Sequence, residues 1–210
     1  MKLTNKTIHR LKQKYGKWVL ITGATSGIGK ELALKFGEAG FNMVITGRRE
    51  QLLNDLSSEL FDQHRVEVIH ACNHLPIGIA VLNAGFGTSG KFIDADIKQE
   101  VNLLDLNCKS LLILTHHFAN KMKEQSQKGA IVLMSSMVAF QGVPNAANYA
   151  ASKAYVQSLG EALAIELKEE GVDILNAAPG PVKSGFSERA NMKMDMSLKP
   201  EDVGCPSFLP

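Results

Sequence analysis

Six short apolar segments, separated by longer amphipathic segments, constrain the fold of this chain more than any other feature. The apolar segments cover residues 18–22, 42–46, 66–71, 77–82, 129–135 and 172–178. The segments between them have the length and apolar spacing of helices, over residues 28–39, 50–62, 97–123 and 148–170. Buried strands that alternate with helices pair in parallel, and the helices cover both faces of the sheet. The sequence therefore predicts an α/β fold, a Rossmann-type doubly wound parallel sheet in three αβα layers.

The length and composition of the chain fit one domain of this kind. The chain has 210 residues, of which 45% are hydrophobic, and this is enough for one sizeable core. We expect a single domain over residues 17–210. A helical lead-in is expected over residues 1–16, because Ile8, Leu11 and Tyr15 have helical spacing and form one apolar face. An alternative role for this basic helix is to lie on a membrane surface.

Charge, cysteine content and hydropathy exclude several classes of function. The formal net charge is +2 and the chain has no long basic run, so no nucleic-acid partner is expected. Cys72, Cys108 and Cys205 are far apart, and neither they nor the six histidines show metal-ligand spacing, so no metal site is expected. No apolar run approaches the ~20 residues that cross a bilayer, and the basic N-terminus lacks the apolar core of a secretory signal. We therefore expect a reduced, cytoplasmic protein without a membrane span.

One predicted connection is too short for its fold. Only residues 72–76 separate the third and fourth strands. These strands are not neighbours in the sheet order 3-2-1-4-5-6, and a parallel crossover needs about a dozen residues or more. We predict that a segment near residues 72–75 is missing, or that a helix has been deleted there. A second omission is predicted after Val203, because residues 197–203 have the start signals of a helix that does not follow.

A glycine-rich segment lies between the first predicted strand and the first predicted helix. Its glycines follow the pattern G-x-x-x-G-x-G, which lets the backbone turn tightly and approach a pyrophosphate at the helix N-terminus. The segment is not the phosphate loop of nucleotide hydrolases, because no Gly-Lys-Ser/Thr closes it. A glycine-rich turn without a ligand is the alternative interpretation. The predicted cofactor-binding residues of this loop are Gly23, Thr25, Ser26, Gly27, Ile28 and Gly29.

The residues after the second predicted strand indicate which dinucleotide binds. An NAD site usually carries an acidic residue there, whereas an NADP site carries arginine for the 2′-phosphate. Arg48 and Arg49 occupy this place, and no acidic residue precedes them. Because a guanidinium group can donate paired hydrogen bonds to a phosphate, we predict NADP(H) in preference to NAD(H). Two solvated arginines at a helix start are the alternative.

Tyr149 lies four residues before Lys153 in a segment predicted to be helical. Residues four apart share one face of a helix, so both side chains can point into the cleft at the carboxyl ends of the strands. A free tyrosine has a pKa near ~10 and is a poor acid or base at neutral pH. A nearby ammonium group and an oxidised nicotinamide both favour the phenolate, so we expect Tyr149 to exchange a proton with the substrate oxygen.

Together, these motifs resemble those of the short-chain dehydrogenases/reductases. TGATSGIG at residues 22–29 resembles their cofactor loop, and Tyr149 and Lys153 match their Tyr-x-x-x-Lys pair. LNAG at residues 82–85 is similar to their Asn-Asn-Ala-Gly motif, with leucine in place of the first asparagine, and PGPVKS at residues 179–184 is similar to their proline-glycine motif. The resemblance covers residues 18–184. It implies further cofactor contacts from Asn83, Ala84, Gly85, Tyr149, Lys153, Pro179, Gly180 and Val182.

The same resemblance implies a catalytic set of Asn107, Ser136, Tyr149 and Lys153. Ser136 lies thirteen residues before Tyr149 and is expected to bond the substrate oxygen, with Ser135 as its neighbour. Lys153 is expected to bond the nicotinamide ribose and to lower the pKa of Tyr149. Asn107 is expected to hold a water that links Lys153 to solvent. Cys72 and Asn73 lie near the place where the family commonly has an aspartate beside the adenine, which is a departure from its pattern.

The resemblance implies an NADP(H)-dependent oxidoreductase that interconverts a ketone or aldehyde and an alcohol. YGKWVLITGAT at residues 15–25 resembles the steroid and fatty 3-ketoacyl reductases of the family, and Met192, Met194 and Met196 are expected to belong to a flexible lid over an apolar substrate. We therefore expect a small to medium hydrophobic substrate, such as a 3-ketoacyl, steroid-like or xenobiotic carbonyl compound. A non-catalytic NADP(H)-sensing regulator and, less favoured by the loop spacing, an epimerase or dehydratase are the alternatives. The family also implies a homodimer or homotetramer that pairs through the helices over residues 97–123 and 148–170.

Overall fold

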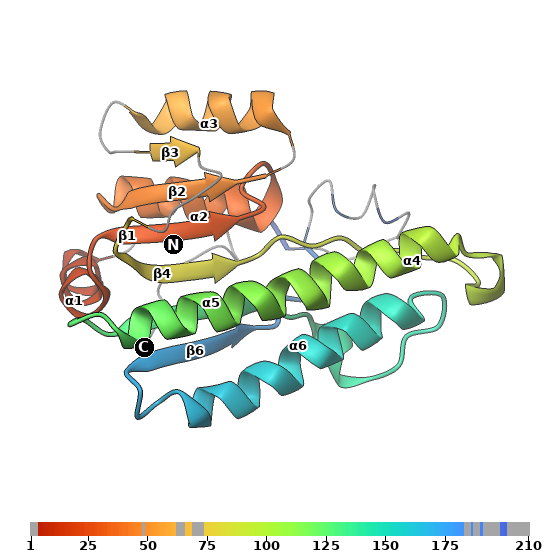
Figure 1. Cartoon of the computed structure of the whole chain (residues 1–210). Coiled ribbons are helices and arrows are strands. Elements are labelled where there is room, and N and C mark those ends of the chain that lie inside the picture. The colour runs from red at the N-terminus through yellow and green to blue at the C-terminus, as the bar shows by residue number, and fades with distance from the viewer. Residues whose placement is uncertain are drawn as a thin grey trace.

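The six predicted strands form one parallel sheet in the order β3-β2-β1-β4-β5-β6 (Figure 1). The structure is a computed structural model that describes residues 4–47, 49–61, 66–68, 74–182, 186, 190 and 198–200. The strands are β1 (Trp18–Thr22), β2 (Asn42–Thr46), β3 (Val66–Val68), β4 (Ile77–Leu82), β5 (Gly129–Met134) and β6 (Val172–Ala177). This order confirms the predicted doubly wound fold. Successive strands are added on one side of β1 as far as β3 and on its other side from β4 onwards, so the order reverses between β1 and β4.

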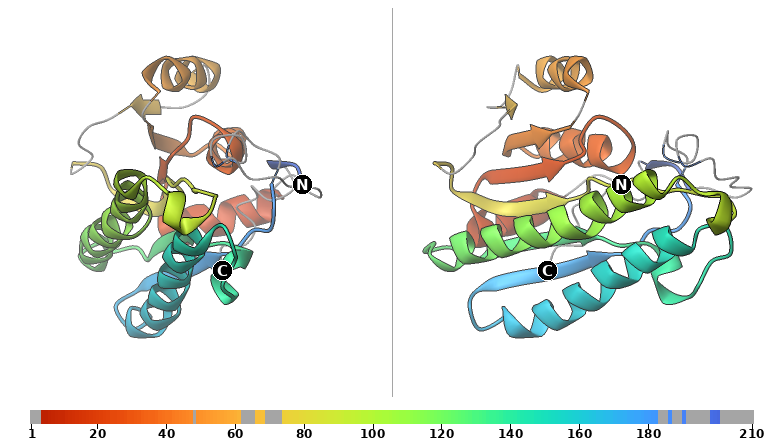
Figure 2. Two further views of the ribbon diagram at one scale, coloured as in Figure 1. Left: turned by 90° about the vertical axis from the view of Figure 1, so that its right-hand side faces the viewer. Right: turned by 45° about the vertical axis from the view of Figure 1, so that its right-hand side comes forward.

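Helices cover both faces of the sheet and give it three layers (Figures 1 and 2). The helices are α1 (Asn5–Tyr15), α2 (Gly27–Glu38), α3 (Glu50–Phe61), α4 (Ile97–Leu104), α5 (Leu111–Lys123) and α6 (Ala147–Glu166). Val19 and Ile21 of β1 belong to one core cluster, with residues of α1 and α2, whereas Leu20 belongs to a second cluster, with residues of α5 and α6. Alternate residues of a strand point to opposite faces, so one buried strand contributes to both cores.

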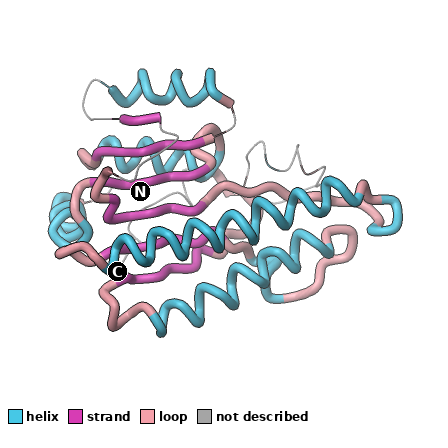
Figure 3. The backbone as a smooth tube through the Cα atoms, in the orientation of Figure 1, coloured by secondary structure: helices cyan, strands magenta, loops and turns pink. Residues whose placement is uncertain are grey.

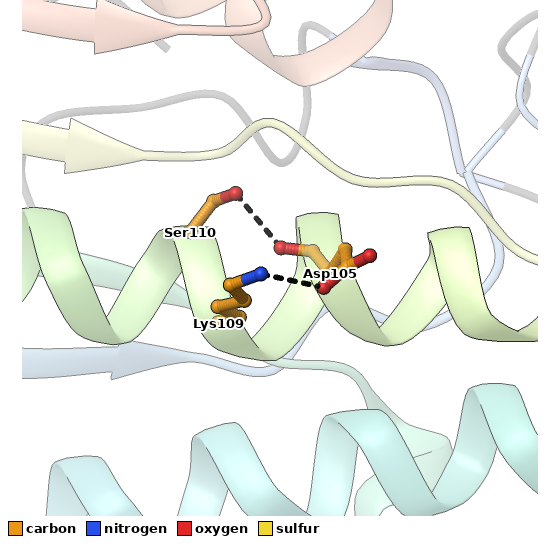
Figure 4. A network of polar contacts seen from close by, with 3 residues as sticks. All are labelled: Asp105, Lys109 and Ser110. Atoms are coloured by element: carbon orange, nitrogen blue, oxygen red, sulfur yellow. Dashed lines mark hydrogen bonds and ion pairs between the residues drawn. The ribbon is translucent and has the colours of Figure 1, made fainter.

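The predicted continuous helix over residues 97–123 is divided by a π-helical turn. This turn, η2 (Asp105–Ser110), separates α4 from α5. The hydroxyl of Ser110 donates to the main-chain oxygen of Asp105 at 2.7 Å, and Lys109 pairs with the Asp105 carboxylate at 3.2 Å (Figure 4). A π turn inserts one residue and changes which side chains face the neighbouring elements, and such turns are frequent at functional sites.

Helix α1 packs on the sheet through the apolar face expected from its sequence. Leu11 and Tyr15 are buried, and the hydroxyl of Tyr15 donates to the carboxylate of Asp173 on β6 at 2.7 Å. Lys14 pairs with the same carboxylate at 2.9 Å. Gly78 lies directly against the main chain of Tyr15, where no side chain would fit. The lead-in helix is therefore joined both to β4 and to β6.

Loops that leave β1, β4 and β5 meet at one edge of the sheet, because all strands are parallel (Figure 3). Two short 3-10 turns lie in these connections, η1 (Phe92–Asp94) and η3 (Met137–Phe140). Arg48, residues 69–73 and residues 201–210 lie outside the described residues, so the predicted omissions near residues 72–75 and after Val203 remain predictions. Among the described helices, none is long and apolar enough to span a membrane.

Candidate active site and cofactor cleft

A cleft of about 730 Å³ opens at the carboxyl ends of β1, β4 and β5. The glycine loop after β1 lines one end, the loop after β4 lines the middle, and the start of α6 lines the other end. Open α/β sheets bind ligands at this edge, where the strand order reverses. Of the predicted site residues, those that line the cleft are Gly23, Thr25, Ser26, Gly27, Ile28, Arg49, Asn83, Ala84, Gly85, Ser136, Tyr149, Lys153, Pro179, Gly180 and Val182.

Gly23 and Gly29 bring the loop after β1 very close to the loop after β4. Gly23 has φ +70°, a conformation that side chains rarely adopt. A Cβ atom on Gly29 would lie 2.5 Å from Asn83 Nδ2 and 2.5 Å from the main-chain oxygen of Gly23. Only glycine fits at this second position. The close approach leaves backbone N–H groups at the start of α2 facing the cleft, as a pyrophosphate site requires.

Thr22 and Asn83 hold the two loops together. The Thr22 hydroxyl accepts hydrogen bonds from the main-chain nitrogens of Asn83 and Ala84, both at 3.0 Å. Asn83 Nδ2 donates to the main-chain oxygens of Thr22 at 3.1 Å and Gly23 at 3.3 Å. Thr22 is buried, so these bonds fix the edge of the sheet before any ligand binds.

Arg49 lies at the mouth of the cleft beside the glycine loop. One of its terminal nitrogens donates to Thr25 Oγ1 at 2.8 Å and to Ser26 Oγ at 2.9 Å. The side chain is therefore held over the loop, with a guanidinium group and two hydroxyls at one point. This set of donors suits an anion such as a phosphate. Arg48, the other predicted arginine, lies outside the described residues.

Tyr149 and Lys153 lie on one face of α6 and point into the cleft. Both are nearly buried, with 8% and 6% of their surface exposed. Lys153 Nζ lies 5.8 Å from the centre of the Tyr149 ring. It donates a hydrogen bond to the main-chain oxygen of Met134 at 2.7 Å, which anchors the ammonium group to the end of β5.

The structure distinguishes Ser136 from its neighbour Ser135. Ser136 lies in the cleft near Tyr149, where its hydroxyl acts to lower the pKa of the phenol, and this hydroxyl accepts from the main-chain nitrogen of Val138 at 3.4 Å. Ser135 also lines the cleft, but its buried hydroxyl donates to the main-chain oxygen of Lys153 at 3.3 Å. Ser136 is thus the serine beside the phenol, and Ser135 joins β5 to α6.

Burial decides the protonation of the two central groups. Burial raises the pKa of Tyr149 above its usual value, and the nearby hydroxyl of Ser136 opposes this effect only in part. The protein's own groups therefore do not produce the acidified phenol expected from the Tyr-x-x-x-Lys spacing, because desolvation outweighs them. Burial also lowers the pKa of Lys153 to about 8. At neutral pH the phenol is protonated, which is the form that can donate a proton to a carbonyl oxygen.

Asn107 lies in the π turn and connects three parts of the site. Its Oδ1 accepts from the main-chain nitrogen of Phe86 at 3.1 Å, and its Nδ2 donates to the main-chain oxygen of Phe86 at 2.9 Å. The same Nδ2 donates to Ser152 Oγ at 3.1 Å. The side chain of Asn107 thus binds the loop after β4 and α6. Its expected role in holding a water remains a prediction.

The walls beside Tyr149 are apolar, and sequence reasoning did not identify these residues. The ring of Phe186 lies 5.4 Å from the ring of Tyr149, centre to centre. Phe86 directly follows the LNAG motif, and Phe186 lies two residues beyond the PGPVKS segment, so their position next to motifs was an available signal. The apolar lining of this part of the cleft comprises Phe86, Leu106, Met137, Val138, Val143, Ala146 and Phe186.

Comparison with protein families gives one clear match. A family model described as short chain dehydrogenase matches residues 17–195. The 7beta-hydroxysteroid dehydrogenase of Collinsella aerofaciens is 32% identical over 180 residues, which cover 78% of this chain and 68% of that protein. A 3-oxoacyl-(acyl-carrier-protein) reductase of Rickettsia prowazekii is 33% identical over 188 residues, covering 85% of this chain and 78% of that protein.

Solved structures show the same arrangement. A short-chain dehydrogenase from Sphingobium yanoikuyae, in complex with NADPH, matches with a TM-score of 0.84 and 28% identity, over 89% of this chain and 81% of that chain. A bulky-bulky ketone specific alcohol dehydrogenase from Comamonas testosteroni matches with a TM-score of 0.80 and 26% identity, over 89% and 79% of the two chains. Each of these two matches covers 89% of this chain.

Proposed function

The chain belongs to the short-chain dehydrogenase/reductase family of NAD(P)-dependent oxidoreductases, and on that premise we propose that it interconverts an uncharged, apolar ketone or aldehyde and its alcohol with NADP(H). Tyr149 is the general acid and base of this reaction. The observation that carries the proposal is that Tyr149, Ser136 and Lys153 line the same cleft as the glycine loop, with Lys153 Nζ 5.8 Å from the centre of the Tyr149 ring.

The residues of the cleft fit a dinucleotide. The close contact between Gly29 and Asn83 forms a cradle that any Cβ atom would fill, and it presents backbone N–H groups to a pyrophosphate. Asn83, Ala84 and Gly85 would border the nicotinamide half, next to Lys153. When bound, the nicotinamide supplies or accepts the hydride, and the protein contributes orientation and electrostatics.

The donors around Arg49 support NADP(H) in preference to NAD(H). Arg49 is held by Thr25 and Ser26 at the end of β2, where the 2′-position of an adenosine ribose is expected in this fold. No acidic residue is present among the described residues that line the cleft, so none there would repel a phosphate. A relative solved with NADPH has the same overall structure.

Three side chains have separate roles in the reaction. Tyr149 donates its phenolic proton to the carbonyl oxygen during reduction and accepts it from the alcohol during oxidation. Ser136, which lines the cleft beside the phenol, donates to the same substrate oxygen and fixes its position. Lys153 holds a positive charge near the oxygen on which negative charge develops, and it is anchored by Met134 so that it does not reorganise.

The lining of the cleft supports an apolar substrate. Among the described residues that line it, the only charged side chains are Arg49, at the cofactor end, and Lys153, in the catalytic set. The remaining space beside Tyr149 is bordered by aromatic and aliphatic side chains, including Phe86, Val143 and Phe186. Burial of a charged substrate group there would be costly because no partner would compensate its charge.

An exposed apolar stripe on α4 and α5 supports the proposed pairing of two or four copies of the chain. The stripe consists of Ile97, Val101, Leu104, Leu112 and Ile113, each between 41% and 66% exposed. Large exposed apolar patches usually mark an interface. Sedimentation or light scattering of the purified protein tests this proposal, and a monomer at micromolar concentration would contradict it.

The decisive experiment measures NADPH and NADH consumption over a panel of ketones. We expect NADPH to be preferred and the preference to fall about tenfold or more in Arg49→Asp, as the loss of charge-assisted hydrogen bonds predicts. Arg48→Asp shows whether the second arginine contributes. Arg10→Asp, an exposed arginine on α1, is the matched control for the change in charge. Equal use of both cofactors by the wild type would contradict the selectivity, and absence of turnover on every ketone would contradict the reaction.

A further inference from the structure

The first turn of α6, which carries Tyr149, has no N-terminal cap of its own. Ala146 precedes the helix and provides no side-chain hydrogen bond, and the first turn contains no acidic residue. The residue before it, Asn145, has φ +62°, a left-handed conformation that is unusual outside glycine. A helix start without these elements is expected to fray. A catalytic residue placed there needs support from elsewhere in the structure.

Glu100 on α4 provides this support. It is a carboxylate with only 8% of its surface exposed. The side-chain amide of Asn148, the residue before Tyr149, donates to Glu100 Oε2 at 2.6 Å and to the main-chain oxygen of Glu100 at 3.0 Å. A buried carboxylate is costly unless it accepts strong hydrogen bonds, and a negative charge is favoured beside a helix N-terminus. The contact therefore supplies the buried carboxylate of Glu100 with a hydrogen bond and places this carboxylate beside the start of α6.

A second polar contact joins the adjoining π turn η2 to α6, one turn further along α6. Asn107 donates to Ser152 Oγ, and the hydroxyl of Ser152 donates in turn to the main-chain oxygen of Tyr149 at 2.7 Å. Tyr149 thus lies between two attachments of α6, at Asn148 and at Ser152. Only the second involves a residue of the expected catalytic set.

We propose that Glu100 is a positioning residue, which acts through Asn148 to hold the phenol of Tyr149 against Ser136. This inference rests on the proposed function of Tyr149. Glu100 borders a separate polar hollow of about 120 Å³ that also contains Asp94, Lys91 and Asn145. It therefore contacts neither the substrate nor the cofactor directly, and its effect passes through the start of α6.

Loss of the contact between Glu100 and Asn148 should affect proton transfer by Tyr149 but not binding of the dinucleotide. If the first turn of α6 loosens, the phenol moves away from Ser136, whose nearby hydroxyl lowers the pKa of Tyr149. The pKa of Tyr149 then rises, and its proton transfer slows. Binding of the dinucleotide at the glycine loop is unaffected, because that loop lies at the other end of the cleft.

The test compares Glu100→Ala and Asn148→Ala with the wild type in alcohol oxidation at several pH values. We expect kcat to fall about tenfold or more, as small displacements of reacting groups do, while the dissociation constant for NADPH stays unchanged. The rise of kcat with pH should shift to higher pH, because the base is the phenolate. The double variant should lose no more than either single variant, since both changes remove one contact. Glu100→Gln keeps an acceptor for Asn148 and should restore most of the activity.

Asp105→Ala is the matched control, because Asp105 is a carboxylate on the adjoining turn that pairs with Lys109 rather than with α6 (Figure 4). We expect it to leave the pH profile in place. A lower kcat in Glu100→Ala with an unshifted pH profile would show a merely structural role and overturn the proposal. So would additive effects in the double variant.

A second measurement separates this proposal from the proposed function. The ultraviolet absorbance of the phenolate reports ionisation of Tyr149 without any turnover, when the same titration of a Tyr149→Phe background is subtracted. Tyr15 does not interfere below its pKa of about 12. If the wild type reduces no ketone, the proposed reaction fails, but a higher pKa of Tyr149 in Glu100→Ala would still support the positioning role. An unchanged pKa would overturn it.

Discussion

Lys153 Nζ donates a hydrogen bond to the main-chain oxygen of Met134, 2.7 Å away, at the carboxyl end of β5. The bond connects the catalytic helix to the sheet through a side chain that is almost entirely buried. Gly85, in the loop after β4, lies beside the same region of the site, since a Cβ there would lie 3.0 Å from Asn107 Oδ1 and 3.7 Å from Lys153 Nζ. The bond to Met134 thus fixes the position of the charge relative to β5.

This burial predicts a pH-dependent contribution of Lys153 to stability. Burial lowers its pKa from 10.5 to about 8, so between these pH values the unfolded chain binds a proton that the folded chain has released. The contribution of Lys153 to the free energy of unfolding therefore rises with pH across this window, by roughly 3 kcal/mol at 1.36 kcal/mol per unit. Below pH 8 the lysine is charged in both states, and the full cost of burying the charge remains.

Urea unfolding of the wild type and Lys153→Met at a series of pH values measures this contribution. Burial raises the pKa of Cys108 and Tyr149, which gives slopes of the opposite sign, but these groups are present in both proteins and largely cancel in the difference. We expect the wild type to gain stability relative to the variant as the pH rises from 8 to 10. Parallel curves would show that Lys153 keeps an ordinary pKa.

Removal of the phenolic hydroxyl tests the general acid directly. Tyr149→Phe should reduce kcat by about 10²–10⁴-fold, the usual contribution of a positioned acid or base. NADPH binding should persist, because the glycine loop and Arg49 are unchanged. Tyr155→Phe is the matched control, since Tyr155 is an exposed tyrosine on the same helix. Full activity in Tyr149→Phe would remove the basis of the proposed reaction.

The strands and their order could be predicted because the signal is local. Each strand is a short apolar run, and three of the six, β1 (Trp18–Thr22), β2 (Asn42–Thr46) and β4 (Ile77–Leu82), have the predicted bounds. The strands β5 and β6 each end one residue before the predicted end. The strand β3 (Val66–Val68) begins at the predicted residue, and the residues predicted to complete it lie outside the described ones. The fold follows from alternation of these runs with helices. The glycine spacing similarly predicts the close contact between the loops, because a residue without a Cβ atom lets two stretches of backbone approach closely.

Other features depend on contacts between residues far apart in the chain. The π turn around Asn107 inserts one extra residue into the helix. The polar partners of the Asn107 side chain are Phe86 and Ser152, and no local sequence pattern connects either of them to Asn107. Glu100 and Asn148 are 48 positions apart, so their bond is visible only in three dimensions. The direction in which the pKa of Tyr149 shifts depends on burial, whereas the sequence shows only the neighbouring charge of Lys153.

The cradle at Gly29 predicts a steric test of cofactor binding. Gly29→Ala places a methyl group 2.5 Å from Asn83 Nδ2 and from the main-chain oxygen of Gly23, so the two loops must separate. We expect NADPH binding to be lost, as measured by fluorescence quenching or calorimetry. Gly142→Ala is the matched control, because a Cβ at Gly142 has no atom within 4 Å. Normal NADPH binding by Gly29→Ala would place the cofactor elsewhere.

The contact between Gly78 and Tyr15 predicts how firmly α1 belongs to the domain. A Cβ on Gly78 would overlap the main-chain oxygen of Tyr15, so Gly78→Ala must displace the end of α1. This displacement should also break the bond from Tyr15 to Asp173 and its ion pair with Lys14. A clash of this kind commonly costs about 1–3 kcal/mol of unfolding free energy.

Thermal unfolding and limited proteolysis of Gly78→Ala can be compared with Gly142→Ala. We expect a lower Tm and early cleavage at the basic residues of α1, since a helix released from the sheet exposes Lys12 and Lys14 to trypsin. Asp173→Asn should reproduce part of the effect above pH 4. Lys14 and Tyr15 hold the pKa of Asp173 below its usual value. Their bonds to the carboxylate stabilise the folded chain only while the carboxylate is charged. If α1 stays protected in both variants, the packing of Leu11 and Tyr15 alone holds the helix on the sheet.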